Sequence, residues 1–280
     1  MRSKTGCYGK LYVVATPIGN LEDMTIRAVR VLKEVGLIAV EDTRHTRKLL
    51  VHYGISTPVT SYHEHNEVGK SAHLVEKIKQ GGDLALVTDA GTPGISDPGY
   101  RLVRHAAQSG VEVVAVPGAS ALTAVLSIAG MPTDEFTFKG FMPTSSARRR
   151  TFLAALRAAA GTFILYESPR RLHAALEDMR LVLGDVELVV AREMTKVHEE
   201  TLRGRVSVII ELVKARRLKG EIAIVVSMEK EPSGEGDIEG ELRALIAAGI
   251  PLKQAVRVAA KELGLPKGMV YKKALEIKGS

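Results

Sequence analysis

Residues 84–99 have the residue types and the spacing best suited to holding a small ligand. An apolar run from Leu84 to Val87 ends abruptly in a loop with three glycines, two prolines and two aspartates. A strand that ends in this way exposes its backbone at its carboxyl end, where small ligands bind in open α/β sheets. The alternative is a long surface turn, because Gly, Pro, Asp and Ser favour turns for backbone reasons alone.

The same pattern recurs after four other apolar runs, which weakens the turn interpretation. Small or turn-forming residues follow these runs at residues 15–20, 116–121, 166–170 and 191–196. Small residues let a ligand approach the main chain closely. Because parallel strands end at the same edge of a sheet, five such loops predict a wide crevice lined by backbone.

The composition of these loops indicates the class of ligand. The chain has no Gly-x-Gly-x-x-Gly after its first strand and no Gly-x-x-x-x-Gly-Lys-Ser/Thr, so the usual dinucleotide and nucleoside triphosphate cradles are missing. Lys and Arg, which a phosphate-bearing ligand favours, are absent from residues 15–20, 88–93 and 116–121. S-adenosylmethionine fits as a ligand without phosphate, because its positive sulfonium is tolerated beside carbonyls and carboxylates. Asp89 and the backbone of residues 89–92 meet that demand.

Strands and helices must alternate along the chain to position these loops. Apolar runs of strand length, several without polar alternation, indicate strands buried on both faces. They span residues 10–16, 37–41, 58–62, 84–88, 111–116, 162–166, 187–191 and 221–227. Amphipathic segments of helical length lie at residues 23–35, 43–53, 66–80, 98–109, 119–130, 146–160, 169–182 and 206–217. This alternation predicts an α/β fold with a mostly parallel sheet.

Two shifts in composition divide the chain. The alternation pauses near Pro117, and residues 229–237 are polar and rich in Gly and charge, as in a flexible linker. Beyond them we expect three short helices, broken near Gly249 and Gly264, which fit a small helix-turn-helix module. The predicted parts are an N-terminal α/β domain (1–117), a C-terminal α/β domain (118–230), a linker (231–237) and a helical module that docks RNA or the ribosome (238–280).

Bulk properties exclude several classes of protein. The 280 residues carry a net charge of +7, which favours a nucleic acid partner, but Trp is absent and aromatic residues are only 4%, against a base-stacking platform. The single cysteine, Cys7, excludes an internal disulfide and fits a reducing compartment. His63 and His65 lack a third ligand at suitable spacing, so no metal is predicted. The N-terminus lacks a secretory signal and Pro117 interrupts the most apolar window, so we expect a cytoplasmic protein with no membrane span.

Basic clusters offer candidate contacts to RNA. Arg148, Arg149 and Arg150 open a helix, where their charges oppose the helix dipole, which favours phosphate contacts over a solvated charge run. Arg170 and Arg171 follow a strand end, so they either face the cleft or form salt bridges at a helix start. The basic residues of the helical module, which either dock the substrate or only solubilise the surface, are Lys253, Arg257, Lys261, Lys267, Lys272 and Lys273.

Seven motifs occur in order along the chain. They are TPIGNLED (16–23), EDTR (41–44), HEHNE (63–67), DAGTPGISDPG (89–99), PGASA (117–121), YESPRR (166–171) and AREMTK (191–196). With these motifs the chain resembles the ribosomal RNA small subunit methyltransferase I family, of the tetrapyrrole-methylase-like class, over nearly its whole length. The resemblance implies two α/β domains with S-adenosylmethionine in the cleft between them, usually in a homodimer. It also implies methylation of a ribose 2′-hydroxyl on a decoding-centre cytidine of 16S rRNA in the small ribosomal subunit.

The resemblance further implies which residues contact the cofactor. They are Pro17, Gly19, Asp89, Gly91, Thr92, Ser120 and Ala121 from the first three loops, and Tyr166, Arg192, Glu221 and Ile222 from the second domain. Some members of the wider class have a glycine-rich first loop, whereas this chain has Pro17 and Asn20 there.

Methyl transfer from a sulfonium depends largely on positioning, but a ribose hydroxyl is a weak nucleophile that a general base would assist. The candidate bases are Asp42, His63, Glu64, Glu167, Glu193 and Lys196. Each has an alternative role in an ion pair, such as Asp42 with Arg44 or Glu193 with Arg192. Two other functions stay open: a tetrapyrrole methyltransferase on the same scaffold, and a nucleic-acid-binding regulator without catalysis.

Overall fold

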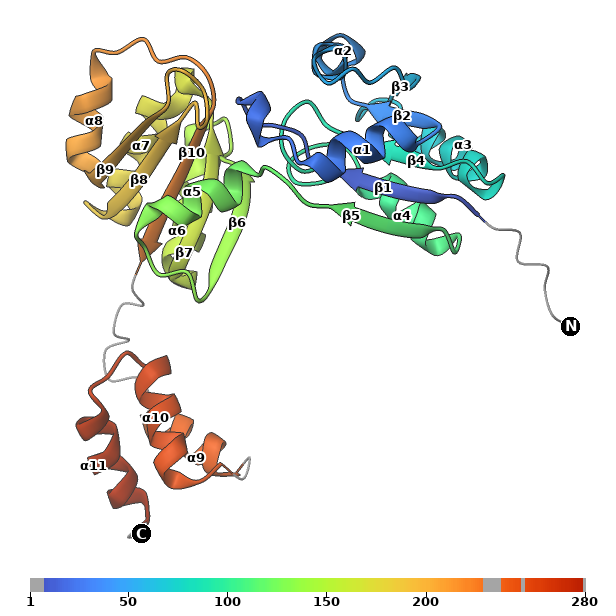
Figure 1. Ribbon diagram of the computed structural model, residues 1–280. Coiled ribbons are helices and arrows are strands. Elements are labelled where there is room, and N and C mark those ends of the chain that lie inside the picture. Colours follow the sequence, from blue (N-terminus) through green and yellow to red (C-terminus); the bar gives the residue numbers. More distant parts are fainter. Residues whose placement is uncertain (1–7, 229–237, 248–249, 279–280) are drawn as a thin grey trace, which may run out of the picture.

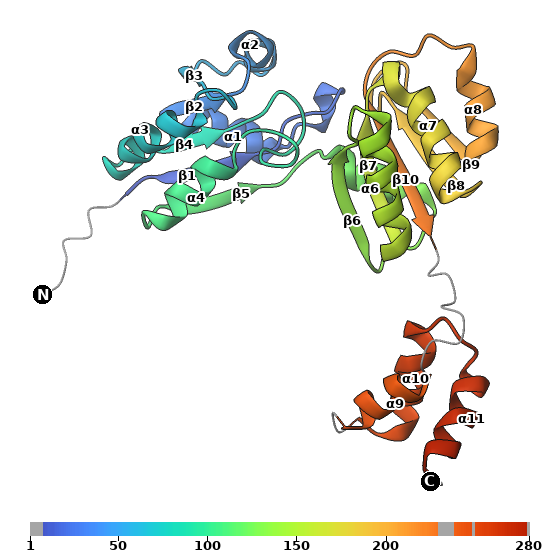
Figure 2. The same cartoon turned by 180° about the vertical axis from the view of Figure 1, so that it is seen from behind.

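The computed structural model describes residues 8–228, 238–247 and 250–278. Two five-stranded sheets, each flanked by helices, are followed by a group of three helices (Figure 1). The view from behind shows the two sheets side by side and the three helices apart from both (Figure 2). Within the described part of the chain, no helix has the length and apolar character needed to cross a membrane.

The first sheet is built from the apolar runs of the N-terminal half. Its strands lie in the order β3-β2-β4-β1-β5, and all its pairs are parallel. This order places the carboxyl ends of β1 and β4 next to each other near the centre of the sheet. The strands are β1 (Lys10–Val14), β2 (Leu37–Val40), β3 (Val59–Ser61), β4 (Leu84–Leu86) and β5 (Glu112–Val116).

Helices cover both faces of this sheet, as strands that are apolar on both sides require. Val14 and Ile38 belong to a core cluster shared with α1, whereas Leu11 and Leu86 belong to one shared with α3 and α4. The side chain of Asp42 begins α2 by accepting a hydrogen bond from the backbone of Arg44 at 2.7 Å. The helices are η1 (Leu21–Asp23), α1 (Ile26–Glu34), α2 (Thr43–His52), α3 (Glu67–Lys79) and α4 (Tyr100–Gln108).

The second sheet is mixed, with strand order β6-β7-β10-β8-β9. Only β6 and β7 pair in parallel, and the other three pairs are antiparallel. The expectation of a mostly parallel sheet is therefore confirmed for the first sheet and wrong for the second. The reason is that β10 inserts between β7 and β8, while β8 and β9 are joined without a crossover helix. The strands are β6 (Phe136–Phe141), β7 (Gly161–Glu167), β8 (Glu187–Arg192), β9 (Glu200–Arg205) and β10 (Ile222–Met228).

The second sheet also packs against helices on both faces. Leu165 and Ile224 lie in a core cluster with α6, α7 and α8, while Ile164 and Val225 lie in another with α5. Ile18, from the loop after β1, joins this last cluster and so links the two sheets. The helices are α5 (Ala121–Ala129), α6 (Ser146–Ala159), α7 (Pro169–Leu183) and α8 (Val206–Lys214).

The C-terminal helices have a core of their own. Leu242, Val256, Ala259 and Val270 are buried together, and that cluster contains no residue from either sheet. The helices are α9 (Ile238–Ala247), α10 (Leu252–Glu262) and α11 (Lys267–Lys278). The three short helices expected after the linker are confirmed, while the linker itself, residues 231–237, lies outside the described residues.

Candidate active site

Two neighbouring loops of the first sheet form one wall of a cleft. The loops after β1 and β4 are joined because Thr16 and Gly91 exchange backbone hydrogen bonds of 2.9 and 3.0 Å. The hydroxyl of Thr16 also donates to the carbonyl of Thr88 at 3.0 Å. Gly91 has a φ of +84°, which residues with side chains rarely adopt, so glycine permits this turn.

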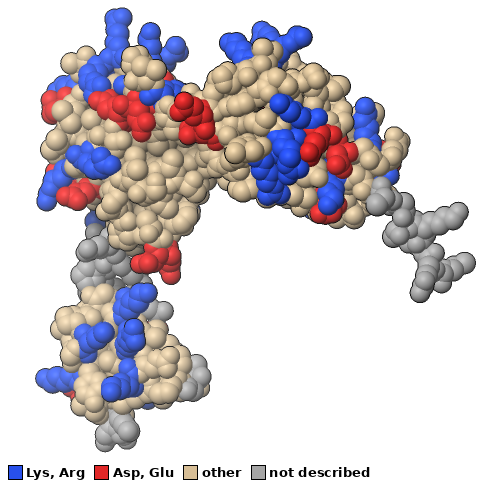
Figure 3. Space-filling view, in the orientation of Figure 1, with Lys and Arg blue, Asp and Glu red and all other residues tan. Residues whose placement is uncertain are grey.

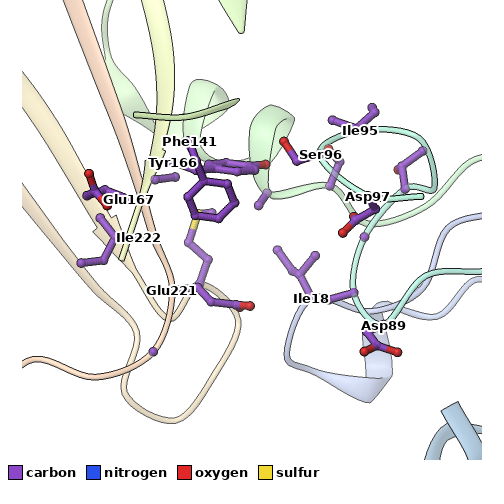
Figure 4. Close-up of a pocket in the computed structure, with 18 of the residues that line it drawn as sticks. Ile18, Asp89, Ile95, Ser96, Asp97, Phe141, Tyr166, Glu167, Glu221 and Ile222 are labelled. Atoms are coloured by element: carbon purple, nitrogen blue, oxygen red, sulfur yellow. The ribbon is translucent and has the colours of Figure 1, made fainter. Parts of the chain in front are cut away.

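The second sheet supplies the opposite wall. Tyr166 and Glu167 end β7, Glu221 and Ile222 stand at the start of β10, and Met194 follows β8. Between the walls lies a cavity of about 470 Å³, within the size range of small-molecule sites, and Figure 4 shows side chains from both walls facing it. Its lining residues are Ile18, Glu41, Asp89, Ala90, Gly91, Thr92, Ile95, Ser96, Asp97, Ser120, Ala121, Phe141, Tyr166, Glu167, Ser168, Met194, Gly220, Glu221, Ile222 and Ala223.

The two sides of this cavity differ in chemistry. Phe141, Tyr166 and Ile222 form an apolar side, where the Tyr166 ring stands edge to face with Phe141 at a centroid distance of 5.6 Å. Burial raises the pKa of Tyr166 to about 12, so the phenol stays neutral. Asp89 and Asp97 contribute carboxylates from the opposite wall (Figure 4). Among the described residues that line this cavity there is no Lys, Arg or His.

The carboxylates lie close enough to one another to disturb their own ionisation. Burial, together with the nearby charges of Glu41, Asp89 and Glu221, raises the pKa of Asp97 to about 7. Burial also raises the pKa of Asp89, against a backbone hydrogen bond from Asp42 of 3.2 Å. A bound cation would relieve this repulsion and favour the charged carboxylates. The cavity is therefore suited to a ligand with an aromatic end and a positively charged end.

Glu167 is a buried carboxylate at the edge of the cavity. Its Oε1 accepts from the backbone of Ser168 at 2.7 Å and from Arg171 at 2.5 Å. Its Oε2 has no hydrogen-bond partner among the described residues and is itself buried, so the carboxylate does not present a free oxygen to the open cavity.

Most residues expected to contact a cofactor do converge. Eight line the cavity: Asp89, Gly91, Thr92, Ser120, Ala121, Tyr166, Glu221 and Ile222. Pro17 and Gly19 instead line an adjoining cavity. Arg192 lines neither, because its guanidinium is paired with Glu200 at 3.2 Å. The structure places these eight residues around one cavity, and their contact with a cofactor stays a prediction.

The six candidate bases are scattered. Glu167 lines the first cavity and Lys196 the adjoining one, whereas Asp42, His63, Glu64 and Glu193 line neither. His63 and Glu64 follow β3, the edge strand farthest from β1 in this half of the sheet.

Three of these candidates are held in hydrogen bonds that oppose a role as base. The hydrogen bond from the Arg44 backbone lowers the pKa of Asp42. Burial alone would raise the pKa of Glu193, but its hydrogen bond with Lys196 lowers it. Burial alone would lower the pKa of Lys196, but hydrogen bonds to Glu193 and Glu221 raise it. Ion pairing of Asp42 with Arg44 is confirmed at 3.3 Å, while Glu193 pairs with Lys196 rather than Arg192.

Sequence reasoning missed two carboxylates of the cavity, Glu41 and Asp97. Both lie inside motifs that were singled out, and Glu41 directly follows β2. Their location in the loops that follow the carboxyl ends of β2 and β4 is the sequence signal that could have identified them. Phe141 and Met194 were also missed, because apolar residues near a strand end look like ordinary core.

The expected RNA contacts differ in exposure. Arg149 is only 3% exposed and pairs with Asp178 at 2.6 Å, so it stabilises the fold and is not accessible to RNA, contrary to the expectation. Arg148 and Arg150 are exposed, although Arg150 also contacts Asp178. Arg170 is exposed, while Arg171 is partly buried beside Glu167.

The helical module presents a basic surface. Lys267 and Lys272 are exposed, and Lys273 is partly exposed beside Glu276 at 3.2 Å. Figure 3 shows Lys and Arg side chains gathered over α9–α11 on one face, with few acidic side chains among them. Such a surface suits a polyanionic partner.

Known proteins resemble this chain over nearly its full length. The family model described as Tetrapyrrole (Corrin/Porphyrin) Methylases matches residues 10–209, and the RsmI C-terminal HTH domain matches residues 234–278. A protein named Ribosomal RNA small subunit methyltransferase I from Synechocystis sp. is 47% identical, covering 96% of this chain and 98% of its own. Proteins of the same name from Pseudomonas aeruginosa and Escherichia coli O157:H7 are each 45% identical, over 97% and 99% of this chain and 98% and 99% of their own.

Solved structures agree in fold. A crystal structure of diphthine synthase superimposes with a TM-score of 0.62 at 17% identity, covering 79% of this chain and 90% of its own. One of uroporphyrin-III-C-methyltransferase from Thermus thermophilus gives a TM-score of 0.56 at 19% identity, covering 87% and 99%. At such identities the likeness concerns the fold alone.

Proposed function

The chain belongs to the ribosomal RNA small subunit methyltransferase I family, among the tetrapyrrole methylases, and from this premise we propose what it does. It transfers a methyl group from S-adenosylmethionine to the ribose 2′-hydroxyl of a decoding-centre cytidine in 16S rRNA. The observation that carries the proposal is the cavity between the sheets, which has carboxylates on both walls, aromatic rings on one of them and no cationic side chain among its described lining residues. A phosphate-bearing cofactor would find no cation there, whereas a sulfonium meets a complementary charge.

Different residues of the cavity contact different parts of the methyl donor. Phe141, Tyr166 and Ile222 offer an apolar surface for an adenine ring. Asp97, on the opposite wall, faces the positive end of the ligand. S-adenosylmethionine, when bound, supplies a methyl group on a positively charged sulfur. The protein's part is to fix the direction of attack and to exclude water.

A carboxylate of the cleft takes the proton of the acceptor hydroxyl. Lys196 is a poor base because two carboxylates hold its ammonium, at 2.8 and 3.0 Å. Of the six candidates from the sequence, Glu167 alone lines the first cavity, but its Oε1 is paired with Arg171 and its Oε2 is buried. Asp89 is the better candidate, because it lines both cavities.

The RNA around the acceptor nucleotide is held by cations at the surface. We assign this role to the exposed Arg148, Arg150, Arg170, Lys267 and Lys272 and to the partly exposed Arg171 and Lys273. The proposal includes division into domains at residues 1–117 and 118–230, a homodimer, and a cytoplasmic location beside its ribosomal substrate.

Methylation of purified small ribosomal subunits tests this proposal. Subunits from cells lacking this chain, incubated with the protein and S-adenosylmethionine, should gain one methyl group on a cytidine ribose, seen by mass spectrometry of 16S rRNA. Subunits from cells that contain the chain are the control, since their site is already methylated. Methylation of a corrin precursor and not of RNA would support the tetrapyrrole alternative. Failure to bind S-adenosylmethionine in a titration would support the regulator.

A further inference from the structure

A second cavity adjoins the first one, and the sequence did not predict it. It has a volume of about 460 Å³ and lies between the loop after β1, the helix α2 and the loop after β8. Four residues line both cavities: Ile18, Asp89, Ala90 and Glu221. The other lining residues are Thr16, Pro17, Gly19, Leu21, His45, Thr46, Lys48, Leu49, Thr88 and Lys196.

The two cavities differ in charge. His45 and Lys48 line the second cavity together with Lys196, whose ammonium is paired with Glu193 and Glu221, whereas the first has no basic lining residue among those described. His45 and Lys48 are exposed on α2, so the imidazole and the ammonium are available to a ligand that enters from solvent. Phosphate groups are attracted to such side chains. The second cavity therefore suits a phosphodiester-linked ligand, which the first cavity does not.

A buried polar atom at the second cavity lacks a partner. Thr46 is 2% exposed, and its hydroxyl has no hydrogen-bond partner among the described residues. Buried hydroxyls in native proteins usually have a hydrogen-bond partner, either protein, ligand or water. This observation is independent of the charges and marks the wall of the second cavity as a place where a polar partner would be favoured.

We propose that the second cavity receives the acceptor nucleotide of the RNA, with Lys48 and His45 beside its flanking phosphates. This inference rests on the proposed function, in which the first cavity holds the methyl donor. The acceptor ribose then meets the wall shared by the two cavities, where Asp89 and Glu221 lie. There the bond from sulfur to the methyl carbon breaks and a bond from the 2′-oxygen to that carbon forms. The hydroxyl proton passes to the Asp89 carboxylate, and the sulfur leaves as a neutral thioether.

Two substitutions on α2 test the proposal, each with a matched control. His45→Trp fills the mouth of the second cavity, and Val51→Trp places the same bulk on an exposed position of α2 that lines neither cavity. Lys48→Gln removes one charge from the cavity, and Lys33→Gln removes one from the last turn of α1. The dissociation constant for S-adenosylmethionine is measured by calorimetry, and KM for small ribosomal subunits by methyl transfer.

We expect His45→Trp to raise KM at least tenfold while the S-adenosylmethionine Kd changes less than twofold. Lys48→Gln should weaken RNA binding and reduce the slope of log K against log salt by about 0.7, the value for one phosphate contact on a single strand. Both controls should match wild type. Normal KM and salt slope in His45→Trp and Lys48→Gln would overturn the acceptor site and leave the proposed function standing. A wild-type protein that binds no S-adenosylmethionine would instead overturn the proposed function.

Discussion

The carboxylates of the donor cavity make binding of S-adenosylmethionine depend on pH. Burial and three neighbouring carboxylates raise the pKa of Asp97 to about 7. A cationic ligand favours the ionised form, so binding lowers this pKa and releases a proton. At pH 7 about half of the unliganded protein holds this proton, so we expect release of about 0.5 proton for each ligand bound.

The affinity follows from the same linkage. If only the ionised form of Asp97 binds tightly, the Kd at pH 6 is about ten times the Kd at pH 8. Calorimetry at pH 7 in buffers of different ionisation enthalpy measures the proton release, and titrations from pH 6 to pH 8 measure the Kd. Asp97→Asn cannot titrate, so it should bind weakly at pH 8 and release no proton. Asp134→Asn removes an exposed carboxylate outside the cavity and should match wild type.

A constant Kd from pH 6 to pH 8, together with equal proton release in wild type and Asp97→Asn, would refute this reasoning. It would mean that the carboxylates do not face the positive end of the ligand. The aromatic side of the cavity would then have to account for the affinity by itself.

The raised pKa of Asp97 also changes the stability of the unliganded protein. From about pH 4 to about pH 7 the folded state binds more protons than the unfolded state, so the free energy of unfolding falls as pH rises through this window. A shift of about 3 units corresponds to at most about 4 kcal/mol, which solvent screening in an open cleft reduces to about 1–2 kcal/mol. Urea unfolding should show Asp97→Asn to be more stable than wild type at pH 8 and similar to it at pH 4.

Three further predictions concern a glycine, a buried arginine and the helical module. A Cβ on Gly19 would lie 2.3 Å from Cγ of Lys196, so we expect Gly19→Ala to lower the free energy of unfolding and to weaken cofactor binding. The loss should be about 1–3 kcal/mol in urea unfolding, and no loss would show that the loop moves freely. Arg149→Ala removes one buried partner of Asp178, which keeps Arg150 and Ser146, and should cost about 1.5–3 kcal/mol, against about 0.5 kcal/mol or less for the exposed Arg148→Ala. Equal losses would contradict a structural role for Arg149. Deletion of residues 234–280 should weaken binding to small ribosomal subunits far more than binding to S-adenosylmethionine, and equal subunit affinity with and without them would contradict RNA docking by this module.

Local patterns were sufficient to predict the helices and all but two of the described strands. The amphipathic segments at residues 43–53 and 169–182 correspond to α2 and α7, because helical periodicity and capping depend on neighbours within a few residues. Two strands were missed, β6 and β9. The sequences of β6 and β9 alternate with polar residues or glycine, unlike the continuous apolar runs that mark strands buried on both faces.

The sequence by itself determined the alternation of strands and helices, the absence of Lys and Arg from the first three loops, and the separate helical tail. Only the tertiary structure decided which loops meet. The order β3-β2-β4-β1-β5 brings Thr16 to Gly91 across 75 residues, and the insertion of β10 places Glu221 opposite Asp97. Tertiary packing also buries the side chain of Arg149, which pairs with Asp178. Strand order and burial depend on contacts between distant segments, whose free energies no local window of sequence contains.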